Sequence, residues 1–362
     1  MPPSGGGQQP QHAGVLAEFA RTLPPEHRDL DAASPLVTLR PMDVEGENRP
    51  ASLASFTHLQ SIRPRSVQPS DDDDNSRGRA ASVGDSAPRD VSMDYVTMEK
   101  LGEGGMATVH LARQVALGRE VALKRIHQRS RSEDAVREEL LKEAVLTGRL
   151  EHPNIIPIYE VGESDDGELF YSMKKIEGRT WDETIDERPL EENLKILLDV
   201  CDAVAFAHAE GVLHRDLKPQ NVMTGEFGEV LVLDWGLAVL TNPGEDVNVT
   251  AGGTPGYMAP EMIKPPYLVG PRSDVYLLGA VLFRILTGQA PHSSKTAQTS
   301  LTAVYENEII EPDRARVEGL DPTGELLAVA LKAMATAPAD RHQNVAALQA
   351  AIRGFESHKE SL

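Results

Sequence analysis

The stretch HRDLKPQN, from His214 to Asn221, places an aspartate, a lysine and an asparagine within one short loop. The carboxylate of Asp216 is of the type that accepts a proton from a substrate hydroxyl. The amide oxygen of Asn221 is a suitable hard ligand for magnesium, and Lys218 adds a positive charge between the two. A loop of this composition could combine proton transfer with metal binding.

A further carboxylate, Asp234, stands at the end of the apolar run in LVLDWGLA. A bare carboxylate at the end of a buried strand costs free energy unless a charged group compensates it. Trp235 and Gly236 follow at once. We therefore expect Asp234 to face a cation.

The stretch LGEGGMATVH, from Leu101 to His110, predicts a glycine-rich turn between two strands. Glycines let the backbone come close to a ligand and present N–H donors to phosphate oxygens. Taken alone, the stretch fits an ordinary hairpin better than a phosphate-binding loop. Its meaning depends on the motifs that follow it.

The next strand ends in VALK, so Lys124 lies at the buried end of a strand and needs a partner. Glu143 on the following helix is our candidate, with Glu138 and Glu139 as rivals. An ammonium fixed by a carboxylate can neutralise phosphate oxygens. The alternative is that these are unrelated surface residues.

In their order along the chain, these motifs resemble those of the protein kinase family, specifically the eukaryotic-like (Hanks-type) Ser/Thr kinases of bacteria. The resemblance rests on the glycine loop, VALK, HRDLKPQN, DWG and APE, and covers about Tyr95 to Phe355. It implies an α+β, bilobal protein kinase fold with a small β-rich lobe, a larger α-helical lobe and a ligand cleft between them. It also implies transfer of the γ-phosphate of ATP to Ser or Thr hydroxyls of proteins, with ATP and Mg²⁺ as cofactors.

The resemblance assigns a role to each motif residue. Asp216, Lys218, Lys124 and Glu143 would be catalytic, and Asn221 and Asp234 would bind magnesium. Trp235 replaces the family's usual phenylalanine and should pack under the helix that carries Glu143. The nucleotide would contact Leu101, Gly102, Glu103, Gly104, Gly105, Met106, Ala107, Thr108, Val109, Ala122, Lys124, Met173 and Ile176.

Two positions depart from the family pattern. Ala107 stands where a third glycine is usual, and Lys174 and Lys175 stand in the hinge where an acidic and an aromatic residue are common. We expect Ala107 to stiffen the loop slightly. The two lysines should not abolish nucleotide binding, because hinge contacts are made largely by the backbone, and activity should survive the replacement by Trp235.

The resemblance also predicts an activation segment from Asp234 to the sequence Ala259-Pro260-Glu261. Thr254 would touch the catalytic aspartate, and Arg341 would pair with Glu261. Asp274 would brace the backbone of the catalytic loop, with helix capping as an even alternative. Thr250, rather than Thr254, would be autophosphorylated, and its phosphate would dock on Arg215 through a charge-assisted pair. A homodimer could carry out this autophosphorylation.

The periodicity of the chain supplies the elements that would position these residues. Two strands are predicted within Tyr95 to Ala112, a third from Glu120 to Arg125, and a hairpin from Ile155–Val161 and Leu169–Met173. A helix is predicted from Glu133 to Leu150, and helices dominate from Leu190 onward, the first ending at Gly211. We place the kinase domain at residues 94–356, divided into lobes at 94–175 and 176–356, with 357–362 as a tail.

Composition sets the remaining limits. The 362 residues carry a formal net charge of -20, which argues against nucleic acid as a partner. The single cysteine, Cys201, indicates a reducing compartment, and no apolar run is long enough to span a membrane, so we expect a cytoplasmic protein.

Residues 1–93 are rich in small and polar residues and predict a largely disordered tail. Val15 to Leu23 could form one short amphipathic helix. The acidic run Asp71–Asp74 fits a solvated linker better than a cation site.

Two other classes of function compete. A pseudokinase scaffold would bind partners without transferring phosphate, but such proteins usually lose one of the residues equivalent to Lys124, Asp216 or Asp234. A small-molecule phosphotransferase of related fold should lack the APE-closed segment that this chain contains.

Overall fold

The computed structural model describes residues 66–69, 93–104, 107–126, 134–164 and 167–360. These residues fall into two compact units that divide between Glu177 and Gly178. Each unit is described by itself below. The predictions for Gly105, Met106, the Val15–Leu23 helix and the Asp71–Asp74 run lie outside the described residues.

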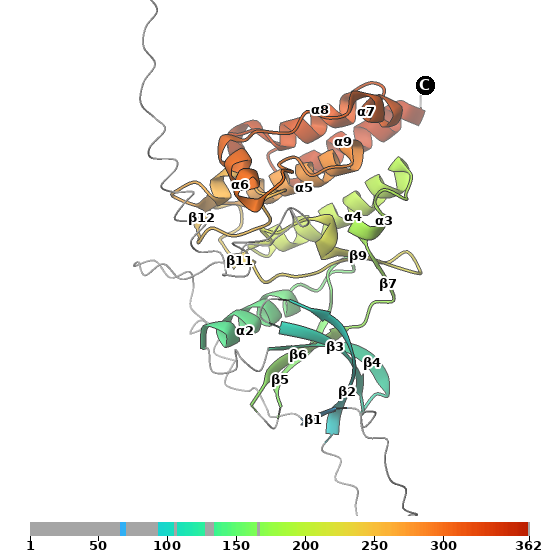
Figure 1. Ribbon diagram of the computed structural model, residues 1–362, viewed down its shortest axis with the longest axis vertical. Coiled ribbons are helices and arrows are strands. Elements are labelled where there is room, and N and C mark those ends of the chain that lie inside the picture. Colours follow the sequence, from blue (N-terminus) through green and yellow to red (C-terminus); the bar gives the residue numbers. More distant parts are fainter. Residues whose placement is uncertain (1–65, 70–92, 105–106, 127–133, 165–166, 361–362) are drawn as a thin grey trace, which may run out of the picture. The chain divides into compact units, whose positions relative to one another are not determined.

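The first unit contains a six-stranded sheet in the order β1-β2-β3-β4-β6-β5 (Figure 1). Its strands are β1 Ser66–Pro69, β2 Met93–Glu103, β3 Ala107–Gln114, β4 Arg119–Ile126, β5 Ile158–Glu163 and β6 Leu169–Lys174. Helix α2, Asp134–Gly148, follows β4. The strands and the helix predicted from the pattern are all present, within a few residues at each end.

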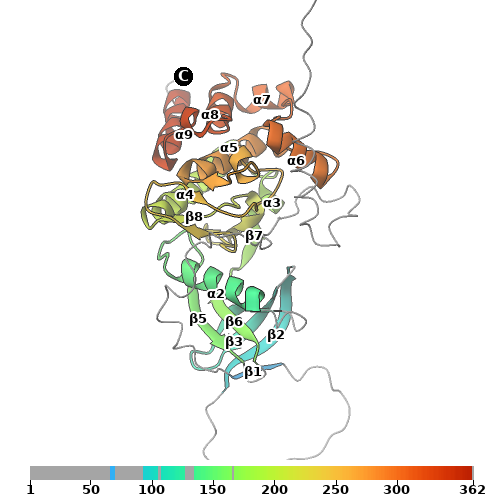
Figure 2. The same cartoon turned by 90° about the vertical axis from the view of Figure 1, so that its left-hand side faces the viewer.

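The two faces of this sheet bury different side chains. Helix α2 lies against one face of the sheet (Figure 2). On that face, Leu169 and Tyr171 pack with Leu140 and Ala144 of the helix. Phe170 points to the other face, where it packs with Tyr95 and other buried side chains. This division follows from the period of two in a strand, which sends successive side chains to opposite faces.

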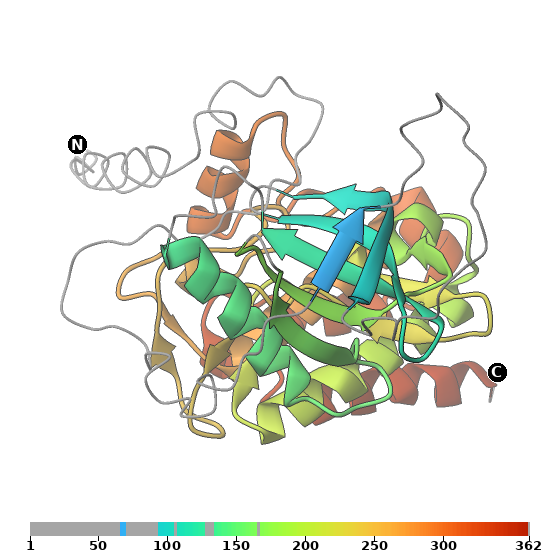
Figure 3. The ribbon, with the colours of Figure 1, turned by 90° about the horizontal axis from the view of Figure 1, so that it is seen from below.

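Strand β1 is a departure from the sequence prediction. Ser66–Pro69 belongs to the segment predicted as disordered, yet it pairs in parallel with β2, with Val67 opposite Tyr95 (Figure 3). Such pairing satisfies backbone groups at an edge of the sheet that would otherwise be left open. Whether a short edge strand forms depends on the strand it pairs with, and the composition of the segment itself does not show that partner.

The second unit is mainly helical. Its helices are α3 Trp181–Thr184, α4 Leu190–Ala209, α5 Pro271–Thr287, α6 Ala297–Glu306, α7 Arg314–Leu320, α8 Glu325–Ala333 and α9 Val345–Glu360. Its short strands are β7 Gly178–Thr180, β8 Val212–Leu213, β9 Val222–Gly225, β10 Val230–Val232, β11 Val239–Leu240, β12 Val247–Asn248 and β13 Leu268–Val269. Three short 3₁₀ turns complete it, at Pro219–Asn221 (η5), Pro260–Met262 (η6) and Pro338–Asp340 (η7).

Helix α5 forms the centre of this unit, because nearly all of its side chains from Ser273 to Thr287 are buried. A Cβ atom on Gly279 would lie 2.4 Å from the Cβ of Ala333, so the glycine allows α5 and α8 to approach closely. Helix α4 ends as predicted before Gly211, whose φ of 71° is favourable only for glycine.

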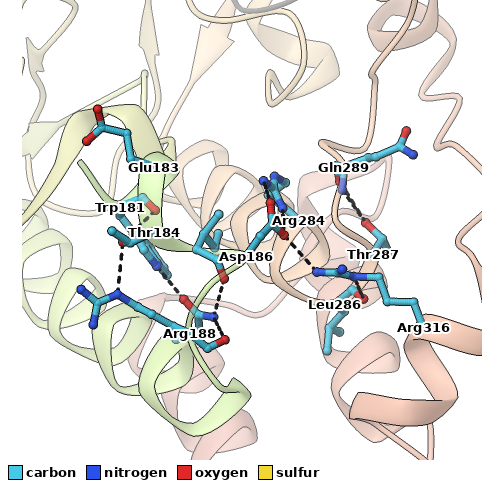
Figure 4. Close-up of polar contacts among 12 residues, drawn as sticks. Trp181, Glu183, Thr184, Asp186, Arg188, Arg284, Leu286, Thr287, Gln289 and Arg316 are labelled. Atoms are coloured by element: carbon cyan, nitrogen blue, oxygen red, sulfur yellow. Dashed lines mark hydrogen bonds and ion pairs between the residues drawn. The ribbon is translucent and has the colours of Figure 1, made fainter. Parts of the chain in front are cut away.

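The loop between α3 and α4 is tied to α5 by an ion-pair cluster (Figure 4). Arg284 donates to both carboxylate oxygens of Asp186, at 3.0 and 2.7 Å, and Arg316 donates to Oδ1 at 3.1 Å. These hydrogen bonds, led by that from Arg284, hold the pKa of Asp186 below its usual value. Within the same region, Trp181 Nε1 donates to Asn193 Oδ1 at 2.7 Å.

In the described part of the chain, no helix combines the length and the apolar character that crossing a bilayer requires.

Candidate active site

The carboxylate of Asp216 is held by three side chains. Thr254 Oγ1 donates to Oδ1 at 2.7 Å, and Lys218 Nζ donates to Oδ2 at 2.8 Å. Asn221 Nδ2 donates to Oδ2 at 3.1 Å and also to the Asp216 carbonyl at 2.8 Å. Lys218 and Thr254 are themselves joined, because Lys218 Nζ donates to Thr254 Oγ1 at 2.6 Å. The carboxylate is only 3% exposed and has a fixed orientation.

The backbone of this loop is fixed by Asp274 of α5. Its Oδ2 accepts from the His214 N–H at 2.9 Å and from His208 Nε2 at 2.8 Å, and its Oδ1 accepts from the Arg215 N–H at 2.9 Å. Burial alone would raise the pKa of Asp274, but the histidine contacts and the backbone N–H donor hold it below its usual value. The Asp274 side chain therefore contacts the backbone of the loop and does not cap its own helix. This is the arrangement expected if Asp274 braces the loop.

Lys124 meets Glu143 within the first unit. Lys124 Nζ donates to Glu143 Oε1 at 2.7 Å and to Oε2 at 2.8 Å. The Glu143 side chain is 4% exposed and that of Lys124 is 13% exposed. Thus Glu143, and not Glu138 or Glu139, lies on the side of α2 that faces Lys124.

Asp234 lies just beyond β10 with a φ of 51°, an uncommon conformation for a residue other than glycine. The preceding residue links this turn to the loop that holds Asp216, because the Leu233 N–H donates to the Asn221 carbonyl at 2.7 Å. His214 Nε2 lies 3.2 Å from the Leu233 carbonyl, and its Nδ1 accepts from the Asp216 N–H. Burial lowers the pKa of His214, so the neutral ring bridges the two segments.

Trp235 is 1% exposed and its ring centroid lies 4.5 Å from that of His214. Its indole Nε1 has no hydrogen-bond partner within the described residues. The expectation that it packs beneath α2 involves both compact units and stays a prediction.

The donor set of Asn221 and Asp234 fits a magnesium ion. Asn221 uses its Nδ2 on Asp216, which leaves its amide oxygen as an acceptor. Magnesium is commonly bound by one or two protein oxygen ligands, with phosphate oxygens and waters completing its shell. Among the described residues there is no cluster of three or more His, Cys, Asp and Glu side chains that could hold a metal without such help.

Several of the residues predicted around the nucleotide lie on strands of the first unit. Gly102 pairs with Val109 and Glu103 with Thr108 across β2 and β3, and Ala122 pairs with Met173 across β4 and β6. The Gly104 N–H donates to the Ala107 carbonyl at 2.9 Å. Ile176 follows the end of β6, and Leu101 is 48% exposed.

The predicted activation segment is anchored at several points. Arg215 donates to the Leu237 carbonyl at 3.2 Å and to the Thr250 carbonyl at 2.6 Å. It is 2% exposed, and burial lowers its pKa to about 10. Just before Thr250, β12 pairs with β13.

At its end the segment is closed by Glu261 and Arg341. Arg341 Nη1 donates to Glu261 Oε1 at 2.6 Å and Nη2 to Oε2 at 2.8 Å. Ser273 Oγ adds a hydrogen bond to Oε1 at 2.7 Å.

The sequence interpretation missed two residues of this arrangement. His208 lies in the helix predicted from Leu190 onward and was given no role, yet it contacts Asp274. Tyr171 was not considered at all, yet its hydroxyl donates to Glu143 Oε1 at 2.9 Å. Its place two residues before Met173, on the same face of β6, was the signal available in the sequence.

The site residues thus form two groups. Asp216, Lys218, Asn221 and Thr254 contact one another in the second unit, whereas Lys124 and Glu143 meet in the first. In both groups, charged side chains are buried together with their partners, as is common at functional sites.

Comparison with known proteins agrees with this geometry. The protein kinase domain family matches residues 95–344. The Ser/Thr-protein kinase PknD of Chlamydia trachomatis is 32% identical over 305 residues, covering 72% of this chain and 31% of that protein. The Ser/Thr-protein kinase PknB of Mycobacterium tuberculosis is 36% identical over 274 residues, covering 73% of this chain and 43% of that protein. The aligned part is thus less than half of either relative. Because the protein kinase domain model matches more than half of this chain, the chain belongs to the protein kinase family.

Proposed function

We propose that the chain is a Ser/Thr protein kinase that transfers the γ-phosphate of ATP to Ser or Thr hydroxyls of proteins. The observation that carries the proposal is the Asp216 carboxylate, buried and fixed by Thr254, Lys218 and Asn221. Positioning of this kind is most of what a phosphoryl-transfer enzyme contributes, because the transition state is loose.

In the proposed reaction, the substrate hydroxyl oxygen bonds to the γ-phosphorus while the bond from phosphorus to the β–γ bridging oxygen breaks. The hydroxyl proton passes to Asp216. Lys218 and Lys124 stabilise negative charge on the phosphate oxygens. Glu143 keeps the Lys124 ammonium in place, since it accepts two of its three N–H groups.

Asn221 and Asp234 are the residues that would hold magnesium. A bound magnesium ion neutralises charge on the nucleotide phosphates. The nucleotide itself would lie against the strand residues named above, with backbone groups near Ile176 meeting the adenine ring. The lysines of this region do not prevent that: Lys175 binds Glu120 and Glu177 on the surface.

Preference for serine and threonine over tyrosine is part of the proposal. Lys218 and Thr254 are the residues that the family's Ser/Thr members carry beside the catalytic aspartate, and here they form a closed triangle with Asp216. The relatives named above are Ser/Thr-protein kinases by name. A role in signal transduction and a cytoplasmic location, which suits the free, buried Cys201, complete the proposal.

A transfer assay with three variants tests the proposal. We expect Lys124→Met and Asp216→Asn to lower the incorporation of labelled phosphate into a generic basic protein at least a hundredfold, the range for loss of a group that acts in the transition state. Asp340→Asn, which changes an exposed carboxylate, is the matched control and should retain activity. Phosphoamino-acid analysis of the product should give phosphoserine and phosphothreonine.

The rival functions predict different results. A pseudokinase scaffold would show a thermal shift with nucleotide but no transfer by the unaltered chain. A small-molecule phosphotransferase would consume ATP without labelling protein. Either result overturns the proposal.

A further inference from the structure

The carboxylate of Glu143 has a third donor besides the two N–H groups of Lys124. Tyr171 OH donates to Oε1 at 2.9 Å, the same oxygen that Lys124 approaches at 2.7 Å. Tyr171 is 3% exposed and Glu143 4% exposed, so water does not compete for this contact. The phenol ring also lies near the lysine, with Lys124 Nζ 5.7 Å from its centroid.

The position of Tyr171 follows from the sheet register. Lys124 on β4 and Tyr171 on β6 are direct partners in the antiparallel ladder, so their side chains emerge on the same face. That face is covered by α2, and Tyr171 packs there with Leu140 and Ala144 of the helix. The hydroxyl is therefore delivered to Glu143 from the rigid sheet and not from a loop.

We propose that Tyr171 is a positioning residue that holds Glu143, and through it Lys124, in the geometry needed for phosphate binding. A glutamate on a helix can swing away from its lysine by rotating its side chain or with a shift of the helix. The phenol makes both changes costly, because each would leave a buried donor without its acceptor. This inference rests on the proposed function, since Lys124 matters only if phosphate binds beside it.

Tyr95 shows what a purely structural phenol looks like in the same sheet. It is fully buried on the opposite face, and its hydroxyl donates to Glu160 Oε2 at 2.8 Å and lies 3.0 Å from Ser172 Oγ. Tyr95→Phe removes one buried hydroxyl without touching Lys124 or Glu143. It is therefore the matched control for Tyr171→Phe.

The first experiment measures the reactivity of Lys124 and needs no catalysis. The full chain is treated with acetic anhydride, and acetylation of the Lys124 peptide is followed over time by mass spectrometry. We expect several-fold faster acetylation in Tyr171→Phe, because a loosened Glu143 protects the amine less, and no change in Tyr95→Phe. Thermal unfolding curves check that the unaltered chain and Tyr171→Phe are both folded. If they are, equal acetylation rates of Lys124 in the two proteins overturn the proposal.

The second experiment is a double-mutant cycle on kcat/KM for ATP. Tyr171→Phe should lower this value on the order of tenfold, the lower end of the effect of a hydrogen bond to a charged group. In a Glu143→Gln background the same substitution should have little further effect, because it acts through the carboxylate. A full tenfold loss in that background overturns the proposal, since Tyr171 would then act elsewhere.

The two experiments separate this inference from the proposed function. If the unaltered chain transfers no phosphate, the proposed function fails, but the acetylation rates still decide whether Tyr171 controls the environment of Lys124. If the chain is active and the acetylation rates are equal, only the role of Tyr171 fails.

Discussion

At the scale of single residues, His292 is an uncharged histidine inside the helical unit. Its Nδ1 lies 2.8 Å from the Glu308 carbonyl and its Nε2 lies 2.6 Å from Tyr276 OH. Arg341 lies over the ring of Tyr276, with 4.9 Å from its guanidinium carbon to the ring centroid. The histidine is fully buried, and burial lowers its pKa to about 4.

This gives a prediction for the pH dependence of stability. The ordinary pKa near 6.5 applies to the unfolded chain, so the unfolded state binds the proton first as the pH falls. His292 therefore destabilises the fold progressively between pH of about 6.5 and 4, by on the order of 3 kcal/mol in total. We expect urea unfolding of His292→Gln to show a shallower loss of stability across this range.

The control for that measurement is His358→Gln. The His358 side chain is 72% exposed, near Glu325 on the surface. Its replacement should leave the pH profile close to that of the unaltered chain. A His292→Gln profile parallel to that of the unaltered chain would show that carboxylates alone cause the acid sensitivity.

At the scale of elements, Arg341 joins three segments. Besides its two bonds to Glu261 in η6, it donates to the Arg272 carbonyl in α5 and to the Ala335 and Thr336 carbonyls before η7. Its side chain is completely buried. A planar fork of N–H groups can serve all these acceptors at once, whereas a lysine ammonium has only three donors.

We predict that Arg341→Lys lowers the free energy of unfolding by about 2 kcal/mol, because a lysine keeps the positive charge but leaves some of these buried acceptors without a donor. Denaturant unfolding measures this, and faster amide exchange near Tyr257 to Lys264 should accompany it. Arg314→Lys, on the exposed face of α7, is the matched change and should have little effect. Equal stabilities of the two variants would contradict the prediction.

The length of a helix or strand decided whether it could be predicted from the sequence. The strands of the first unit and helices α2 and α4 were predictable, because alternation and helical spacing extend over many residues there. Strands such as β8, β11, β12 and β13 have two residues each, too few for any period. They form because distant segments pair, as Val239 does with Leu213.

At the scale of the whole molecule, the motifs of the site are distributed over two compact units. Their order along the chain and their resemblance to a family assigned them to one site. The resemblance also selected Glu143 for Lys124, a choice that residue types alone left open because it depends on the phase of α2 against β4. Tyr171 was not predicted, although its spacing from Met173 was visible in the sequence, because its role depends on its register opposite Lys124.

Autophosphorylation of Thr250 could take place within one copy of the chain or between two copies. Thr250 is exposed, but its carbonyl accepts from Arg215 Nη2 at 2.6 Å, which fixes its backbone. The carboxylate of Asp216 is already engaged by Thr254 of the same chain. The Thr250 hydroxyl of one copy would have to break the Arg215 contact to reach its own Asp216, so we predict that a second copy catalyses the transfer of phosphate from ATP to Thr250.

Mixing two forms of the chain tests this prediction. A Lys124→Met copy, distinguished by a mass tag, serves as acceptor for the unaltered enzyme, and phosphate on Thr250 of the tagged copy is measured by mass spectrometry. We expect Thr250 to be modified there, at a rate that rises with enzyme concentration, and not to be modified when Asp216→Asn replaces the unaltered enzyme. Once added, the phosphate can form a charge-assisted pair with the Arg215 guanidinium in place of the carbonyl contact. A fully active enzyme with unmodified Thr250 would contradict activation by phosphorylation of Thr250. The hydrogen bonds from the Arg215 side chain to carbonyls of the segment would then hold it without a phosphate.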